Sequence, residues 1–208
     1  LLAPPAARRG AMAVVVYCTT NDGKWQEALH AFSAARPSAS LRRGEVDPVE
    51  VQGSASEITA AKTAEAARLL AASAPDTLAG ADWVLAEDAG LEMDCLNGFP
   101  GNYCKPMMEA VGPAGLWDLV SRYAEAERGC AVTCTVGAVR AELAPEASAG
   151  DVRVFRGELR GRLVAPRGGV MHGKASWNGL FLPSGWDRTF GELSFEEQAG
   201  MSHRRRAI

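Results

Sequence analysis

The sequence has few of the residues from which zinc sites and disulfide frameworks are built. It contains three histidines and five cysteines, and no two cysteines have the C-x-x-C spacing. A structural zinc site or a disulfide framework needs close ligand spacings or an even set of thiols. Scattered free thiols are typical of a reducing compartment, so we expect a cytoplasmic protein.

Long apolar runs and a large net charge are absent as well. No run approaches the roughly 20 apolar residues that span a bilayer, so we expect no membrane partner. The formal net charge of −3 disfavours duplex nucleic acid as the main partner, because affinity for the phosphate backbone comes from an excess of lysine and arginine. The length of 208 residues suits one globular domain.

Residues 1–12 differ in composition from the rest of the chain. They are rich in Pro, Ala and Arg, contain no acidic residue and lack the apolar core of a secretory signal. We interpret residues 1–12 as a disordered leader, with a mitochondrial presequence as the alternative, and residues 13–208 as a single domain.

Apolar runs and helical patterns alternate along this domain. Runs of β-branched and apolar residues predict strands at residues 14–18, 83–86, 131–139 and 152–163. Helices are predicted at residues 24–35, 56–74 (with Ser56 as N-cap), 107–111 and 115–126, and a capping-box pattern at residues 194–197 predicts a further short helix. The alternation predicts an α/β domain with a mixed sheet.

The first predicted strand ends in a turn rich in helix N-cap residues. The turn reads Thr19-Thr20-Asn21-Asp22-Gly23, and Lys24 begins the helix that follows. Free N–H groups and the helix dipole favour anions at such a helix N-terminus. We therefore expect a phosphate-binding turn here.

Two adjacent carboxylates, Glu87 and Asp88, follow the second predicted strand, and the chain then breaks at Ala89-Gly90. Like charges this close repel each other unless a cation lies beside them. With Glu50 they form a set of hard oxygen ligands suited to Mg²⁺ and a bound phosphate. From spacing alone, the interpretation of any single Lys or Glu as a solvated surface charge is favoured. The lysines that suit a polyphosphate chain are Lys24, Lys62 and Lys105.

Five stretches in fixed order carry a family resemblance. They are TTNDGKWQE, EVQGSASEI followed by Lys62, EDAGLEMDCLNGFPG, FRGELRGRLVAPRG and SHRRRAI. Over residues 14–208 the chain resembles the inosine triphosphate pyrophosphatase family. The resemblance implies hydrolysis of inosine and xanthosine triphosphates, and their deoxy forms, to the monophosphate and pyrophosphate, with Mg²⁺ or Mn²⁺ as its substitute. It also implies an elongated mixed β-sheet flanked by helices, two lobes around a central active-site cleft, and a homodimer.

The resemblance assigns roles to residues of this sequence. Asp88 would be the catalytic residue that activates the attacking water, and Glu50, Glu87 and Asp88 would hold the metal. Charge neutralisation and a positioned water are what phosphoryl transfer requires. The residues that would bind the substrate are Thr19, Thr20, Asn21, Asp22, Gly23, Lys24, Lys62, Asp88, Ala89, Lys105, Trp177, Asn178, His203 and Arg204.

The stretch Ser202–Arg206 has two interpretations. It is a basic tail, or by the resemblance it is the motif that contacts the purine. A protein donor at this position can hydrogen-bond to the 6-oxo oxygen of hypoxanthine or xanthine. The 6-amino group of adenine is itself a donor, so it would leave the protein donor unpaired. Under the second interpretation, His203 and Arg204 recognise the base.

The chain also departs from the family pattern, mostly where the base would be contacted. Trp177 keeps the expected aromatic residue for stacking. The departures bear on the range of substrates rather than on the reaction. They are Ala175 for Phe, Ser176 for Gly, Asn178 for Asp, Gln198 for a substrate-binding Lys, Ala89 for Thr or Ser, and extra residues around 172–174.

Other functions fit parts of the same pattern. A house-cleaning pyrophosphatase for modified pyrimidine or methylated nucleotides would share the phosphate and metal residues. A nucleotide-binding sensor without turnover would keep the lysines but would not need Asp88. Stable nucleic-acid binding through Arg204–Arg206 is disfavoured by the net charge and by the lack of interleaved aromatic residues.

Overall fold

The structure is a computed structural model that describes residues 12–168 and 176–208. Its tertiary contacts divide the chain into two compact units. The first unit contains the residues up to Asp88, Thr135–Arg156 and Ala207–Ile208; the second contains Ala89–Cys134 and Gly157–Arg206. Apart from Met12, the predicted leader lies outside the described residues, and a single domain over residues 13–208 stays a prediction.

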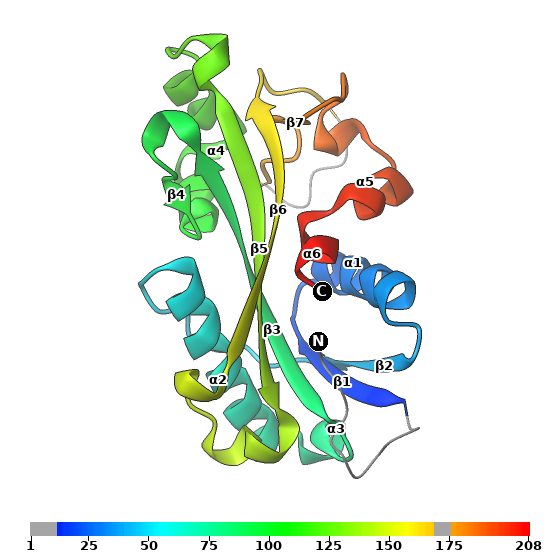
Figure 1. The fold of residues 1–208 in the computed structure, drawn as a ribbon. Coiled ribbons are helices and arrows are strands. Elements are labelled where there is room, and N and C mark those ends of the chain that lie inside the picture. Colours follow the sequence, from blue (N-terminus) through cyan, green and yellow to red (C-terminus); the bar gives the residue numbers. More distant parts are fainter. Residues whose placement is uncertain (1–11, 169–175) are drawn as a thin grey trace. The chain divides into compact units, whose positions relative to one another are not determined.

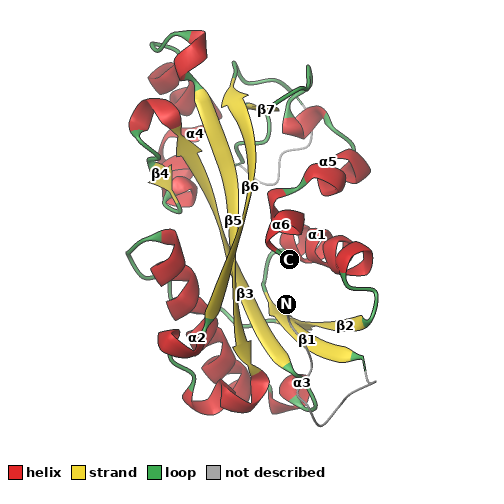
Figure 2. Ribbon diagram, viewed as in Figure 1, coloured by secondary structure: helices red, strands yellow, loops and turns green. Residues whose placement is uncertain are grey.

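The strands belong to one mixed sheet of seven strands, in the order β2-β1-β3-β5-β6-β7, with β4 paired to β3 (Figures 1 and 2). β1 is parallel to both β2 and β3, whereas the pairs β3–β4 and β6–β7 are antiparallel. The predicted α/β class with a mixed sheet is therefore confirmed. The strand bounds are β1 Ala13–Cys18, β2 Ala39–Gly44, β3 Trp83–Met93, β4 Pro100–Gly101, β5 Gly129–Arg140, β6 Arg153–Leu163 and β7 Phe181–Pro183.

In the first unit, α1 (Asp22–Ala35) and α2 (Ala55–Ser73) lie on opposite faces of the strands (Figure 1). The short α3 (Pro75–Leu78) follows α2. Val16 of β1 and Val84 of β3 share a buried cluster with Leu70 of α2. Tyr17 points to the other face, since side chains alternate along a strand, and its ring lies 6.5 Å from that of Trp25 in α1.

The second unit is built around α4 (Cys104–Val120), with α5 (Phe195–Met201) and α6 (His203–Ala207), whose last residue belongs to the first unit. Met108 and Leu116 of α4 pack in one core with Leu91 of β3 and Phe181 of β7. α4 contains a break at Gly112, where φ is +65°. Two helical segments therefore lie on either side of Gly112, as predicted for residues 107–111 and 115–126, but the second segment ends at Val120 rather than at residue 126.

β3 is longer than predicted. The strand was expected to end at Ala86, but it continues to Met93, so the acidic pair lies inside the strand. Gly90 was read as a turn residue, yet it is buried in the strand, where an added Cβ would lie 2.7 Å from Thr133 Oγ1. Glycine is needed here because Thr133 and the backbone of Gly101 approach closely, and not because the backbone turns.

Helix capping was predicted at two places. Ser194 caps α5 in a capping box with Glu197, which confirms the prediction. For α2, the N-cap is Ser54 rather than Ser56, because Ser54 accepts a hydrogen bond from Glu57 N and Glu57 bonds back to it. No helix in residues 12–168 or 176–208 combines the length and apolar character needed to cross a membrane.

Candidate functional site

The predicted anion-binding turn joins β1 to α1 in the first unit. Asn21 is the N-cap of α1, and its Oδ1 accepts a hydrogen bond of 3.0 Å from Lys24 N. Thr19 Oγ1 accepts a second bond, of 3.1 Å, from Asn21 N. These bonds fix the turn at the carboxyl end of a parallel strand, which is where α/β proteins commonly bind phosphates.

Arg43 of β2 holds the same turn from the neighbouring strand. Its Nε donates to Thr19 O at 3.0 Å, and its Nη1 contacts Asp22 Oδ1 at 2.7 Å. The guanidinium carbon lies 6.0 Å from the centre of the Trp25 ring. Sequence analysis missed Arg43, because its position beside the turn depends on the parallel register that places it opposite Tyr17.

Glu87 is a buried carboxylate that contacts Tyr17 and Lys24 in the first unit. Only 3% of the residue is exposed. The Tyr17 hydroxyl donates a short hydrogen bond to Glu87 Oε2, and Lys24 Nζ lies 3.2 Å from Oε1. Glu87 therefore holds the Lys24 ammonium in one position, and Tyr17 in turn orients Glu87. A buried charge needs such partners to remain ionised.

Asp88 contacts a different lysine. Lys62 of α2 places its Nζ 3.5 Å from Asp88 Oδ1 and 3.1 Å from Glu50 Oε1. Alternation along β3 directs Glu87 towards α1 and Asp88 towards α2. The repulsion expected between the two neighbours is thus relieved by opposite directions and by separate lysines.

The predicted metal ligands are brought together only in part. Glu50 and Asp88 contact the same ammonium group, whereas Glu87 points to the other face of the strand. In the part of the chain that the structure describes, no three or more His, Cys, Asp or Glu side chains are grouped to hold a metal. Mg²⁺ at a phosphate site needs only one or two protein carboxylates. The Glu50 and Asp88 oxygens fit that requirement.

The thiol beside the anion turn, that of Cys18, has a raised pKa. Cys18 ends β1 directly before Thr19, and burial raises the pKa of its thiol to about 12. Burial also raises the pKa of Cys130 in the second unit to about 12, and the nearby Asp94 carboxylate adds to the effect. Both thiols stay protonated at neutral pH, so neither is suited to act as a nucleophile.

Two predicted substrate residues of the second unit lie in different surroundings. Ala89 is half-buried in β3, and Lys105 is exposed in the first turn of α4. Neither carries a contact that assigns a role by itself.

Trp177 and His203 belong to an aromatic cluster in the second unit. The Trp177 ring lies 6.0 Å from the His203 ring, 5.8 Å from Phe190 and 5.6 Å from Phe181. Trp177 remains half-buried, whereas His203 is 3% exposed. The structure thus brings together two of the residues predicted to recognise the base, and Phe190 and Phe181, which sequence analysis did not single out, support them.

The basic C-terminal stretch is divided between interior and surface. Arg204 is 3% exposed, and its backbone N–H donates to Ser202 Oγ at 3.1 Å. Arg205 and Arg206 are exposed, and Arg206 Nη1 donates to Glu158 O at 2.8 Å. A solvated basic tail is therefore a poor description of His203 and Arg204.

The departures from the family pattern have different consequences. Gln198 is buried, and its Nε2 donates to Phe190 O at 2.7 Å and to Leu193 O at 3.1 Å, so it supports the backbone beside the aromatic cluster. Asn178 is buried, and its Nδ2 has no hydrogen-bond partner among the described residues. Ala175 and the extra residues around 172–174 lie outside the described residues.

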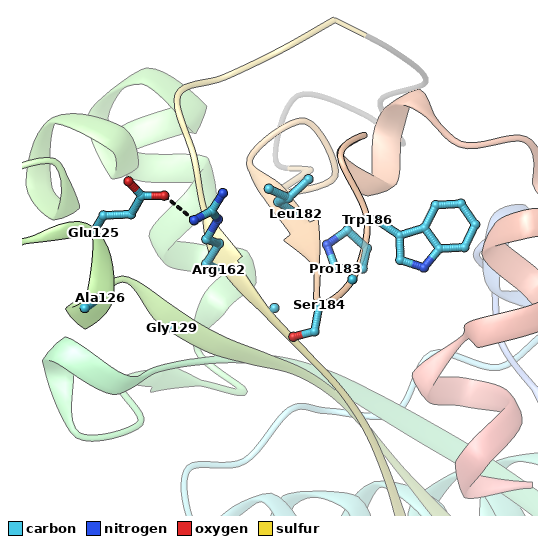
Figure 3. A pocket seen from close by; sticks show the side chains of 10 residues that line it. Glu125, Ala126, Gly129, Arg162, Leu182, Pro183, Ser184 and Trp186 are labelled. Atoms are coloured by element: carbon cyan, nitrogen blue, oxygen red, sulfur yellow. Dashed lines mark hydrogen bonds and ion pairs between the residues drawn. The ribbon is translucent and has the colours of Figure 1, made fainter.

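A depression of about 660 Å³ in the second unit is separate from these side chains (Figure 3). Arg162 and Glu125 pair across one wall, and Leu182, Pro183 and Trp186 form the other. None of the residues predicted to bind substrate or metal lines it. Its two charged lining residues, Glu125 and Arg162, pair with each other, so its lining carries no surplus of positive charge for a triphosphate.

Comparison with known proteins gives consistent matches over most of the chain. A protein from Yarrowia lipolytica named inosine triphosphate pyrophosphatase is 32% identical over 194 residues, which cover 93% of this chain and 91% of that protein. A protein of the same name from Schizosaccharomyces pombe is 32% identical over 166 residues, covering 79% and 76%. The solved structure of a HAM1 protein from Coxiella burnetii shares the fold, with a TM-score of 0.70 at 20% identity over 94% of each chain. Residues 15–208 match the Ham1 family, and the chain therefore belongs to that family.

Proposed function

We propose that this chain is a nucleoside triphosphate pyrophosphatase that hydrolyses deaminated purine nucleotides, inosine and xanthosine triphosphates and their deoxy forms, to the monophosphate and pyrophosphate. Membership of the Ham1 family and the names of the relatives support this activity. One structural observation carries it. The first unit combines a helix N-terminal anion turn with Lys62, which contacts both Glu50 and Asp88.

For the phosphates, we assign the turn and the lysines. Backbone N–H groups at the start of α1 favour the negative charge of a triphosphate. Lys24 is held in place by Glu87, so little side-chain entropy is lost when it contacts a phosphate. Glu87 then acts as the partner that positions Lys24. The residues assigned to the phosphates are Thr19, Thr20, Asn21, Gly23, Lys24, Lys62, Ala89 and Lys105, together with Asp22 through its backbone N–H alone.

For the metal, we assign Glu50 and Asp88 as the ligands of Mg²⁺, or of Mn²⁺ in its place. The ion would supply neutralisation of charge on the phosphate oxygens. Lys62 contacts both carboxylates, so the acids and the phosphates compete for its ammonium group. This competition couples the binding of the triphosphate to the release of the two carboxylates.

Asp88 is our choice for the catalytic residue. Hydrolysis to the monophosphate and pyrophosphate breaks the α–β anhydride and adds the oxygen of water to one phosphorus. A proton of that water must leave, and the carboxylate of Asp88 is suited to accept it. Asp88 is half-buried in β3, so the strand fixes its direction while water can still reach it.

For the base, we assign residues of the second unit. His203 and Arg204 are buried donors suited to a 6-oxo group, and Trp177 is half-buried beside His203. Asn178 is assigned to the edge of the base. A house-cleaning role for other modified nucleotides is the second candidate function, since Asn178 and Ser176 alter this set of residues.

We also propose a cytoplasmic homodimer that binds no nucleic acid stably. The location rests on the five cysteines, all of which are free thiols.

The activity is tested by incubating the protein with inosine triphosphate and Mg²⁺ and separating the products. We expect inosine monophosphate and pyrophosphate in equal amounts. Release of orthophosphate, or no release at all, would contradict the proposal.

A further inference from the structure

We propose that Arg43 is a positioning residue for triphosphate binding, which fixes the β1–α1 turn and offsets the charge of Asp22. The inference rests on the proposed function, since it concerns the turn assigned to the phosphates. Arg43 belongs to none of the motifs of the sequence. Its place comes from the end of β2, which lies parallel to β1.

The first part of the inference is the double attachment of the turn to β2. Thr19 N donates to Gly44 O at 3.0 Å, which continues the backbone ladder between β1 and β2 by one bond. Thr19 O in turn accepts from Arg43 Nε at 3.0 Å. Both backbone groups of Thr19 are therefore held by consecutive residues of β2. The Arg43 bond is the one that a side-chain substitution can remove.

The second part concerns charge. Asp22 is the first residue of α1, at the helix N-terminus where an anion would bind, and an acid there repels a triphosphate. Its contact with Arg43 Nη1, at 2.7 Å, offsets that charge locally. Because 87% of the Asp22 side chain is exposed, solvent screens the pair, and it adds little to stability. We expect its effect on anion binding rather than on folding.

The third part is the direction of the guanidinium. It lies 6.0 Å from the centre of the Trp25 ring, and 21% of the Arg43 side chain is exposed. A rigid planar group that lies near an aromatic ring and donates from two nitrogens loses little entropy in this role. Lysine has one donor atom and cannot reproduce both contacts, so an Arg-to-Lys change separates geometry from charge.

The test compares Arg43→Gln and Arg43→Lys with Arg42→Gln as the control. Arg42 is the neighbour of Arg43 in β2, and its Nη1 donates to Thr77 O and Ala79 O at the end of α3, away from the turn. For each variant, KM and kcat for inosine triphosphate and the Kd of tripolyphosphate by calorimetry are measured. Tripolyphosphate reports on the turn without turnover, so a failure of the proposed activity does not remove the test.

We expect Arg43→Gln to raise KM and the tripolyphosphate Kd about tenfold, with kcat changed less than about twofold, since both the charge-assisted bond to Thr19 O and the counter-charge of Asp22 are lost. Arg43→Lys should restore part of the affinity, and Arg42→Gln should leave both constants unchanged. When Asp22 is replaced by Asn, Arg43→Gln should raise KM and the tripolyphosphate Kd by a smaller factor. The inference is overturned if Arg43→Gln and Arg42→Gln give the same constants, or if the loss is the same with Asn at position 22.

Discussion

Glu87 and Asp88 are neighbours in β3, yet each carboxylate contacts a different lysine. Lys24 lies 3.2 Å from Glu87, and Lys62 lies 3.5 Å from Asp88. Alternation along the strand separates the two acids, and each gains its own counter-charge. The buried acid is held by a hydroxyl and an ammonium, whereas the half-buried acid remains accessible to water. The two carboxylates therefore have different tasks, and substitutions should distinguish them.

The first prediction concerns Asp88. Asp88→Asn keeps the size of the side chain but removes the carboxylate that would accept a proton. We expect kcat to fall about a hundredfold or more, because general-base catalysis contributes on this scale. The Kd of inosine triphosphate, measured by calorimetry with the inactive variant, should change far less. Turnover at the wild-type rate would show that another group accepts the proton.

The second prediction separates the metal ligands from the acid that positions Lys24. Glu50→Gln should raise the Mg²⁺ concentration needed for half-maximal activity about tenfold or more, since a ligand charge is lost. Glu87→Gln should leave that concentration unchanged and raise KM for the triphosphate instead. Titration of activity with Mg²⁺ at saturating substrate measures the first effect. If both variants raised the required Mg²⁺ concentration equally, Glu87 would be a metal ligand as well.

The third prediction concerns the Tyr17 hydroxyl, which orients Glu87. Tyr17→Phe leaves a buried carboxylate oxygen without its donor, and we expect the free energy of unfolding to fall by about 1–3 kcal/mol. KM should rise, because Glu87 without the tyrosine hydroxyl no longer holds Lys24 in one position. Tyr123→Phe is the matched control, because the described structure contains no hydrogen bond from the Tyr123 hydroxyl. Denaturant unfolding and steady-state kinetics measure the two effects. If the variant matched its control in both, the hydroxyl would have no such role.

The fourth prediction tests why Gly90 lies in β3. In Gly90→Ala the new Cβ would meet Thr133 Oγ1 at 2.7 Å and the backbone of Gly101 at 3.1 Å. Overpacking of this kind costs about 1–3 kcal/mol in the free energy of unfolding. Gly200→Ala in α5 is the control, because nothing lies within 4 Å of its added Cβ. That control should be neutral or slightly stabilising. Equal stability of the two variants would contradict the close approach.

Local sequence signals predicted the parts of the site that depend on neighbouring residues along the chain. The β1–turn–α1 unit followed from an apolar run and from cap residues, and Asn21 does cap α1. The predicted end of β3 was wrong, because Ala89-Gly90 has the composition of a turn. The glycine is needed because Thr133, which is distant in sequence, lies close to it. With the strand predicted to end at Ala86, the sequence also did not indicate that Glu87 and Asp88 point in opposite directions.

The contacts of Arg43 and Tyr17 could not be predicted in the same way. Both depend on the register between strands that are distant in sequence: Tyr17 lies opposite Arg43 in β2 and opposite Leu85 in β3. An apolar run predicts that a strand forms, but it does not say which residues of another strand lie beside it. Arg43 and the tyrosine hydroxyl therefore had no sequence signal of their own.

Selectivity for the base tests the central claim most directly. The measurement is kcat/KM with Mg²⁺ for inosine, xanthosine, adenosine and guanosine triphosphates, with deoxyuridine and methylated triphosphates in the same series. We predict that inosine or xanthosine triphosphate is preferred over ATP by about a hundredfold or more, because buried donors reject the 6-amino group. If inosine triphosphate were hydrolysed no better than ATP, the account of this protein as an enzyme for deaminated purine nucleotides would be contradicted.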